Sequence, residues 1–171
     1  MAALSAIALG VITLFGLNHF WLSWRFARTR RLIDGPVPEE RPAEELSDWP
    51  RVTVQIPIYN EVLVADRVIA ACARLDYPPS KLEIQVLDDS TDDTVKVAAD
   101  SVRFWRRQGI NMVHLHRTHR RGYKAGALAD GLRVARGEFI AMFDADFVPP
   151  RSFLRTLVGR FQDDDVGLVQ A

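Results

Sequence analysis

The sequence predicts an α/β domain, an open and mostly parallel sheet with helices on both faces, preceded by one transmembrane helix. Three observations lead to this prediction. Strand patterns recur about every 25 to 30 residues after residue 50, as in successive βαβ units. Helical patterns lie between them. The first 24 residues contain no Asp, Glu, Lys or Arg, and the chain of 171 residues suffices for one domain with its own core.

Residues 1–24 are predicted to be the transmembrane helix, because about 20 apolar residues span a hydrocarbon core of ~30 Å. Trp21 and Trp24 suit a membrane interface, and Arg25 and Arg28 begin a basic stretch. This asymmetry predicts an integral protein of the cell or inner membrane, with the lipid bilayer as a partner and the following domain in the cytoplasm. A cleavable signal peptide and a buried core helix are the alternatives.

Residues 25–50 predict a basic juxtamembrane segment followed by an acidic, proline-rich linker, since proline breaks regular structure. The globular domain is expected over residues 51–171. Lys plus Arg and Asp plus Glu both number 22, so net charge does not favour nucleic acid as a partner. Cys72 is the single cysteine and lies among alanines, which indicates a buried structural thiol.

Five strands are predicted from short apolar runs. The first is expected to stop before Pro57, because proline cannot donate to a central ladder. The fourth is continuously apolar, which is typical of a strand buried on both faces. The predicted strands cover residues 51–56, 82–87, 112–115, 139–143 and 166–169.

Four helices are predicted between these strands. The second repeats apolar residues at helical spacing, with Ser90 or Thr91 as its cap and Asp92 and Asp93 in its first turn. Gly137 follows the end of the third. The predicted helices cover residues 61–74, 92–107, 124–135 and 152–161.

Ligands of such sheets bind beyond the carboxyl ends of the strands. Polar residues follow four of the predicted strands, so they are expected at one edge of the sheet. These groups are residues 59–61, 88–90, 117–124 and 144–146.

Asp144 and Asp146 are two residues apart at the end of a strand, so both carboxylates are expected on one side. Two carboxylates repel each other unless a cation intervenes, and Mg²⁺ accepts one or two carboxylates together with phosphate oxygens. A solvated turn is the alternative. Flanking Phe143 and Phe147 favour the metal site.

Asp88 and Asp89 are expected to face a ligand, since the next residues already supply helix caps. One of them is expected to accept a hydrogen bond from a nucleobase or ribose, and the other to support it or the metal. Lys124, at a helix start, is expected to contact a diphosphate, whereas Arg120 is consistent with a solvated surface. His114 and His116 alternate along a strand and could share a face, which suggests a zinc site, but no cysteine accompanies them.

Four motifs resemble those of the family-2 glycosyltransferases, in order and at that family's spacing. They are similar to the cellulose-synthase-like branch, which includes glucomannan mannosyltransferases and glucan synthases. The resemblance implies a nucleotide-diphospho-sugar domain of the GT-A type in a membrane-bound, inverting hexosyltransferase. Its expected partners are a UDP-glucose or GDP-mannose donor and a growing β-linked polysaccharide acceptor. The motifs are residues 55–61, 86–92, 121–128 and 143–147.

The resemblance also implies a role for each matching residue. Lys124 would touch the diphosphate, and Asp88 or Asp89 would lie near the base. Asp144 and Asp146 would hold Mg²⁺ or Mn²⁺. The implied donor-binding residues are Pro57, Tyr59, Glu61, Asp88, Asp89, Lys124 and Asp144.

Members of this family carry their general base and acceptor-binding motifs further along the chain, and we expect those motifs beyond Ala171. The sequence therefore predicts a donor-binding half with no catalytic base and little turnover by itself. A non-catalytic nucleotide-sugar-binding membrane subunit and a haloacid-dehalogenase-type phosphohydrolase are the alternatives.

Overall fold

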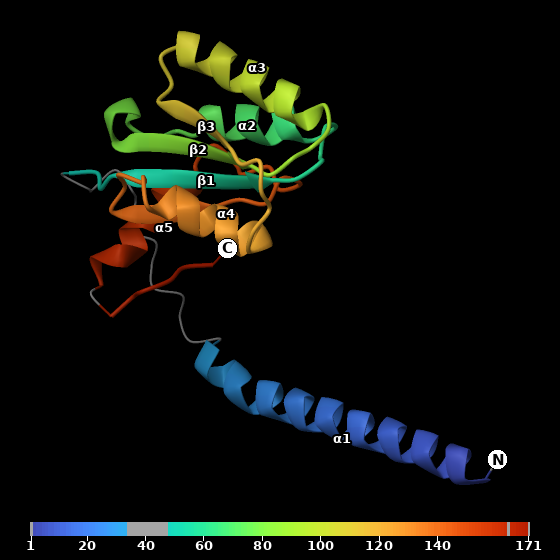
Figure 1. The fold of residues 1–171 in the computed structure, drawn as a ribbon. Coiled ribbons are helices and arrows are strands. Elements are labelled where there is room, and N and C mark those ends of the chain that lie inside the picture. Colours follow the sequence, from blue (N-terminus) through green and yellow to red (C-terminus); the bar gives the residue numbers. More distant parts are fainter. Residues whose placement is uncertain (1, 34–47, 164, 171) are drawn as a thin grey trace. The chain divides into compact units, whose positions relative to one another are not determined.

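The computed structural model describes residues 2–33, 48–163 and 165–170, and it divides into two units, Met1–Glu40 and Arg41–Ala171. In the first unit, α1 (Ala2–Ile33) is one continuous helix (Figure 1). Among the described residues, no helix combines the length and the mean hydropathy of a membrane span. The helix predicted over residues 1–24 is thus confirmed as a helix but not as a membrane span, and most of the predicted linker, residues 34–47, lies outside the described residues.

The described part of the second unit contains a parallel sheet in the order β3-β2-β1-β4 (Figure 1). β1 pairs with β2 along its whole length, from Val52 opposite Leu82 to Ile58 opposite Asp88. The first four predicted strands are confirmed. They are β1 (Val52–Ile58), β2 (Leu82–Asp88), β3 (Met112–His116) and β4 (Phe139–Met142).

Two strand predictions are wrong. β1 continues through Pro57 to Ile58. Gln55 faces β4, since its O accepts from Phe143 N at 3.1 Å. Alternate residues of a parallel strand bond to the same side, so the backbone of Pro57 also faces the β4 side. β4 has ended at that level, so the missing N–H of Pro57 costs no ladder bond. Residues 166–169 form no strand, because they pair with no strand in the part of the chain that the structure describes.

α2 and α3 cover one face of the sheet and α4 covers the other (Figure 1). α2 begins four residues later than predicted, after a turn at residues 62–64, and α5 gives way early to a 3₁₀ turn. α3 begins at Thr94, two residues later than predicted, so Asp92 and Asp93 precede its first turn and the expected cap by Ser90 or Thr91 is wrong. The N-cap residue Asp93 makes no side-chain cap hydrogen bond, whereas Asp92 Oδ1 accepts from Thr94 N at 3.0 Å. The helices are α2 (Ala65–Ala73), α3 (Thr94–Arg107), α4 (Tyr123–Leu132) and α5 (Phe153–Val158), with 3₁₀ turns η2 (Pro79–Lys81) and η3 (Gly159–Gln162).

The main core lies between the sheet and α2. Val54 and Ile56 of β1 and Ile69 of α2 are completely buried there. Each such side chain contributes about 1.5–3 kcal/mol through removal of apolar surface from water. Cys72 lies in the same core, and burial raises the pKa of its thiol to about 12, which confirms the predicted inert, structural cysteine.

On the other face of the sheet, Gly131 of α4 packs against polar side chains of β1 and β2. A Cβ on Gly131 would lie 2.7 Å from Gln55 Nε2 and 2.9 Å from Gln85 Oε1. Both glutamines are buried, and Gln55 Nε2 donates to Gln85 Oε1 at 3.0 Å. The absent side chain therefore lets α4 lie directly on β1 and β2, which fixes the position of its first turn at the carboxyl edge of the sheet.

Candidate functional site

The structure brings four predicted site residues together at the carboxyl edge of the sheet. Asp144 and Asp146 follow β4, Glu61 follows β1, and Lys124 lies in the first turn of α4. Lys124 Nζ donates to the Asp144 carboxylate. Burial, followed by the negative charges of Asp146 and Asp144, raises the pKa of Glu61, so its carboxyl lies within electrostatic reach of both. Three carboxylates and one ammonium thus share this part of the edge.

The Asp144–Asp146 segment alternates between buried anchors and exposed carboxylates. Phe143 and Ala145 are 3% and 4% exposed, whereas Asp144 and Asp146 are exposed. The Phe143 ring packs edge-to-face on Phe153 at 5.0 Å between ring centroids. The apolar residues therefore anchor the backbone, and both acids keep oxygen lone pairs available to a ligand.

These residues fit a divalent cation. Burial is the main cause of the raised pKa of Glu61, and the negative charges of Asp146 and Asp144 add to it. A bound divalent ion would relieve that repulsion, and an all-oxygen, solvent-accessible donor set suits Mg²⁺ or Mn²⁺. Asp144 and Asp146 are the residues that would hold the ion, with Lys124 as a further positive charge beside them.

Asp88, at the end of β2, is engaged inside the protein. It is completely buried; its Oδ1 accepts from Ser90 N at 2.8 Å, and its Oδ2 lies 2.8 Å from His114 Nε2. Burial by itself would raise the pKa of Asp88, but the hydrogen bonds from His114 and Ser90 outweigh that effect and lower it. Its expected contact with a nucleobase or ribose stays a prediction.

Asp89 is held by Arg117, the first residue after β3. Nε and Nη2 of Arg117 donate to the two Asp89 carboxylate oxygens, each at 2.6 Å, a bidentate geometry. Nη1 of Arg117 donates to Asp130 of α4 at 2.9 Å, and Nη2 also donates to Tyr123 O at 3.1 Å. Arg117 thus ties the end of β2 to the first turn of α4, which carries Lys124.

Arg117 has a role that sequence reasoning missed. The sequence shows several cations in one loop, and Lys124 is the residue chosen from them. The available signal is position, since Arg117 directly follows a strand at the binding edge, as Asp89 does. Its partner Asp130, directly before Gly131 in α4, belongs to no motif and could be identified only from the fold.

The three residues Asp88, His114 and His116 form a second group of possible metal ligands. One ligand atom of each lies within 4.8 Å of the others, and His116 Nδ1 is 3.6 Å from Asp88 Oδ2. The weak zinc hypothesis for His114 and His116 thus gains a buried carboxylate. The short His114–Asp88 contact already satisfies one oxygen, so the group also serves to join the ends of β2 and β3.

The loop after β1 is ordered by bonds to the loop after β2. Asn60 has a left-handed backbone (φ 53°), and its N donates to Ser90 Oγ at 2.9 Å. Asn60 Oδ1 accepts from Thr91 N at 2.9 Å. These bonds hold Asn60, and with it the adjacent Tyr59 and Glu61, at the binding edge. Non-glycine residues with a left-handed backbone cluster at functional sites.

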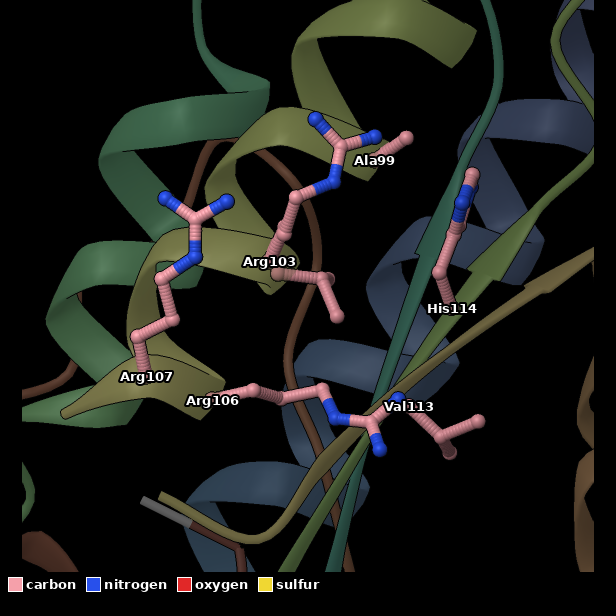
Figure 2. Close-up of a pocket in the computed structure, with 7 residues that line it drawn as sticks. Ala99, Arg103, Arg106, Arg107, Val113 and His114 are labelled. Atoms are coloured by element: carbon pink, nitrogen blue, oxygen red, sulfur yellow. The ribbon is translucent and has the colours of Figure 1, made fainter. Parts of the chain in front are cut away.

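A pocket of about 450 Å³ lies between α3 and β3, and neither Asp144 nor Asp146 lines it. Figure 2 shows Arg103, Arg106 and Arg107 of α3 around it, with His114 at its strand side. A second pocket of about 370 Å³ lies between β3 and α4 and is lined in part by Arg117 and Asp130. Neither pocket includes the paired carboxylates, which lie on an open part of the edge.

The parallel sheet with an acidic group after β4 defines an α/β domain with a ligand-binding edge, and comparisons with known proteins identify its family. The model of "Glycosyl transferase family 2" matches residues 53–171. The chain therefore belongs to glycosyl transferase family 2, an enzyme family, as the four motifs indicated. Membership in this family argues against the alternative of a haloacid-dehalogenase-type phosphohydrolase.

Three similar proteins sharpen this placement. Glucomannan 4-beta-mannosyltransferase 1 of rice (Oryza sativa subsp. japonica) is 41% identical over 83% of this chain. Probable glucomannan 4-beta-mannosyltransferase 11 of the same plant is 45% identical over 71%. The structure of a mannosyltransferase from Pyrobaculum calidifontis, in complex with GDP-Man and Mn²⁺, matches 91% of the chain with a TM-score of 0.73 and 32% identity. The predicted resemblance to the cellulose-synthase-like branch is confirmed.

The chain spans only part of these proteins. It covers 28% and 22% of the two plant enzymes and 44% of the Pyrobaculum protein.

Proposed function

We propose that this chain is the donor-binding part of a membrane-associated hexosyltransferase that extends a β-linked polysaccharide. The observation that carries the proposal is the exposed pair Asp144 and Asp146 beside Lys124 and Glu61 at the carboxyl edge of the sheet. The exposed carboxylates suit the cation of a ligand, and the Lys124 ammonium beside them suits its anion. A metal-bound sugar diphosphate is such a ligand.

The donor is proposed to be GDP-mannose, with UDP-glucose as the second candidate. Two similar proteins are named glucomannan mannosyltransferases, and the similar solved structure contains GDP-Man and Mn²⁺. When bound, the metal ion supplies positive charge that stabilises the departing nucleotide diphosphate. Mn²⁺ or Mg²⁺ is the proposed cofactor.

The chain's own residues have distinct tasks in this scheme. Asp144 and Asp146 orient the cation, and Phe143 and Ala145 keep their backbone in place. Lys124, now paired with Asp144, becomes available to a phosphate oxygen once another cation takes over that carboxylate. Tyr59, Glu61, Asp88 and Asp89 are proposed to shape the nucleotide side. The general base and the acceptor site are proposed to lie in sequence beyond Ala171.

Calorimetry with GDP-mannose and with UDP-glucose, each with and without Mn²⁺, tests the donor proposal. We expect Mn²⁺-dependent binding, and we expect Asp144→Ala or Asp146→Ala to weaken it at least about tenfold, or about 1.4 kcal/mol. Asp100→Ala, which removes a carboxylate from an exposed pair on α3, serves as the control. Unchanged affinity in both site variants would refute the metal assignment. We also expect this chain to bind donor without extending polysaccharide.

We further propose that α1 holds the protein at the membrane, with the globular domain on the cytoplasmic side. Support comes from exposed apolar side chains along α1, including Leu14 and Phe20. The guanidinium groups of Arg25 and Arg28 lie over Trp21 and Trp24, at 5.0 and 4.9 Å from the ring centroids. Arginine beside tryptophan is typical of a membrane interface.

Flotation with phosphatidylcholine vesicles tests the membrane proposal. The whole chain should float with the vesicles, and a chain beginning at Asp48 should not. Resistance to extraction by alkaline carbonate would indicate an integral helix, and release would indicate a surface-bound one. Absence of the whole chain from the vesicle fraction would contradict membrane association.

A further inference from the structure

Arg120 lies against two tyrosine rings at the binding edge. Its guanidinium carbon is 3.3 Å from the ring centroid of Tyr59, which follows β1, and 5.1 Å from that of Tyr123, which begins α4. The shorter distance corresponds to stacking of the planar guanidinium on the Tyr59 ring. Two segments far apart in sequence thus form one cation–aromatic cluster.

This cluster borders the acidic group. Tyr59 is two residues before Glu61, and Tyr123 is directly followed by Lys124, the partner of Asp144. Gly122 and Tyr123 both have left-handed backbones, at φ 73° and φ 52°. A Cβ on Gly122 would approach Gly126 to 3.1 Å, so the tight turn itself requires glycine there. Tyr123 accepts an unfavourable backbone conformation at this turn, and the residue is 68% exposed.

Arg120 differs from Arg117 in what its N–H groups do. Those of Arg117 bond to Asp89, Asp130 and backbone carbonyls. Within residues 48–163, the structure shows no hydrogen bond or ion pair of the Arg120 guanidinium. Stacking occupies the face of that group, which leaves its N–H edge to meet a ligand.

The chemistry of that edge selects among nucleobases. A guanidinium presents parallel N–H donors, and guanine has two adjacent acceptors, O6 and N7, that receive them as a bidentate pair. Uracil has carbonyl acceptors on opposite sides of a ring nitrogen that is itself a donor, so it offers no such pair. A base that reaches this cluster is therefore bound more tightly if it is guanine.

We propose that Arg120 is a specificity-determining residue of the donor site, which recognises the O6–N7 edge of a guanine base while stacked on Tyr59. This inference rests on the proposed function, since it requires that a nucleotide binds at this edge. It assigns the site to a guanosine diphosphate sugar, and it gives a ligand-binding role to a residue that the sequence suggested to be simply solvated.

Calorimetry of the whole chain with GDP and with UDP, both with Mn²⁺, tests the proposal. The wild type is expected to bind GDP at least tenfold more tightly than UDP. Arg120→Ala should weaken GDP binding about tenfold and leave UDP binding within twofold. Arg120→Lys should behave like the alanine variant, because an ammonium cannot form two parallel hydrogen bonds. Arg121→Ala, the removal of a neighbouring cation, should change the affinities for GDP and UDP by the same factor.

Three results would overturn the proposal. Equal weakening of GDP and UDP binding in Arg120→Ala would show a general charge effect. Wild-type affinity of Arg120→Lys for GDP would show that the forked geometry is not used. An unchanged or stronger affinity of Arg120→Ala for GDP would show that Arg120 makes no favourable contact with the base. Failure of the wild type to bind either nucleotide would instead contradict the proposed function, and circular dichroism of each variant would establish that it is folded.

Discussion

The two halves of the carboxyl edge differ in how their polar residues are partnered. After β2 and β3, the side chains of Asp88, Asp89 and Arg117 are buried or nearly so. Arg117 bonds directly to Asp89, and Asp88 lies within hydrogen-bond distance of His114. After β4, Asp144 and Lys124 have side chains that are 62% and 55% exposed. The closed half therefore holds strands and loops together, whereas the open half keeps charges in solvent at the position where a ligand can take them.

An unpaired charge is costly when it is desolvated but not when it is exposed to solvent, so the two halves should differ in whether their residues affect stability or ligand binding. Substitutions in the closed half should mainly lower the free energy of unfolding. Substitutions in the open half should mainly change affinity for the donor. The following variants test that division, in order of expected effect.

Arg117→Ala should have the largest effect on stability. Its side chain and that of Asp89 are 11% and 4% exposed, so the variant leaves a buried carboxylate without its cation. We expect the free energy of unfolding to fall by about 3–5 kcal/mol. Urea denaturation followed by circular dichroism measures this change.

Arg103→Ala is the matched control, because it breaks a pair with Asp100 in which both side chains are more than half exposed. It should cost at most about 1 kcal/mol. Similar losses in the two variants would contradict the distinction between buried and exposed pairs.

Asp88→Asn should cost about 1–3 kcal/mol at neutral pH, since a buried hydrogen-bonded charge is replaced. It should also flatten the acid dependence of stability. The pKa of Asp88 is lowered in the folded chain, so its stabilising effect is complete above its ordinary value of 3.8 and is lost as pH falls through the lower folded value.

Urea denaturation at a series of pH values below about 5 measures this slope for both proteins. Asp92→Asn is the control, because Asp92 is exposed and an asparagine oxygen can still accept the hydrogen bond from Thr94 N. An acid slope in Asp88→Asn as steep as that of the wild type would show that Asp88 is not the group responsible.

Lys124→Gln should change binding much more than stability. The lost ion pair is exposed, so the free energy of unfolding should change by less than about 1 kcal/mol. Loss of a charge-assisted contact to phosphate should weaken GDP binding about tenfold. Lys96→Gln on α3 controls for the change in net charge, and a stability loss as large as that of Arg117→Ala would contradict the open character of this half.

Glu61→Gln should have the smallest effect, a gain in stability of a few tenths of a kcal/mol at pH 7 without metal. Burial and the charges of Asp146 and Asp144 raise the pKa of Glu61, so ionisation in the folded chain lowers stability as pH rises through that pKa. The gain should vanish below its ordinary value of 4.5, where the wild-type carboxyl is protonated. Thermal unfolding at pH 4 and pH 7 measures it, and a loss of stability at pH 7 would contradict the sign.

Much of this organisation could be predicted from the sequence. Apolar runs and helical periodicity are local properties, so they located four strands and four helices to within a few residues. The parallel alternation then implied that Glu61, Lys124, Asp144 and Asp146 meet at one edge, and the structure brings them together. Cys72 as a buried, inert thiol followed from its alanine-rich surroundings.

The features that only the tertiary structure decided are those that depend on which neighbour a residue packs against. Pro57 remains within β1 because β4 ends beside it, a fact about another strand. Residues 166–169 have strand composition but no partner among the described strands. Arg117 and Arg120 lie in the same basic loop, yet burial against Asp89 makes one a structural clamp, and stacking on Tyr59 leaves the other available to a ligand. Sequence supplies the local preference and the charge, whereas burial and partnership arise only when distant segments pack together.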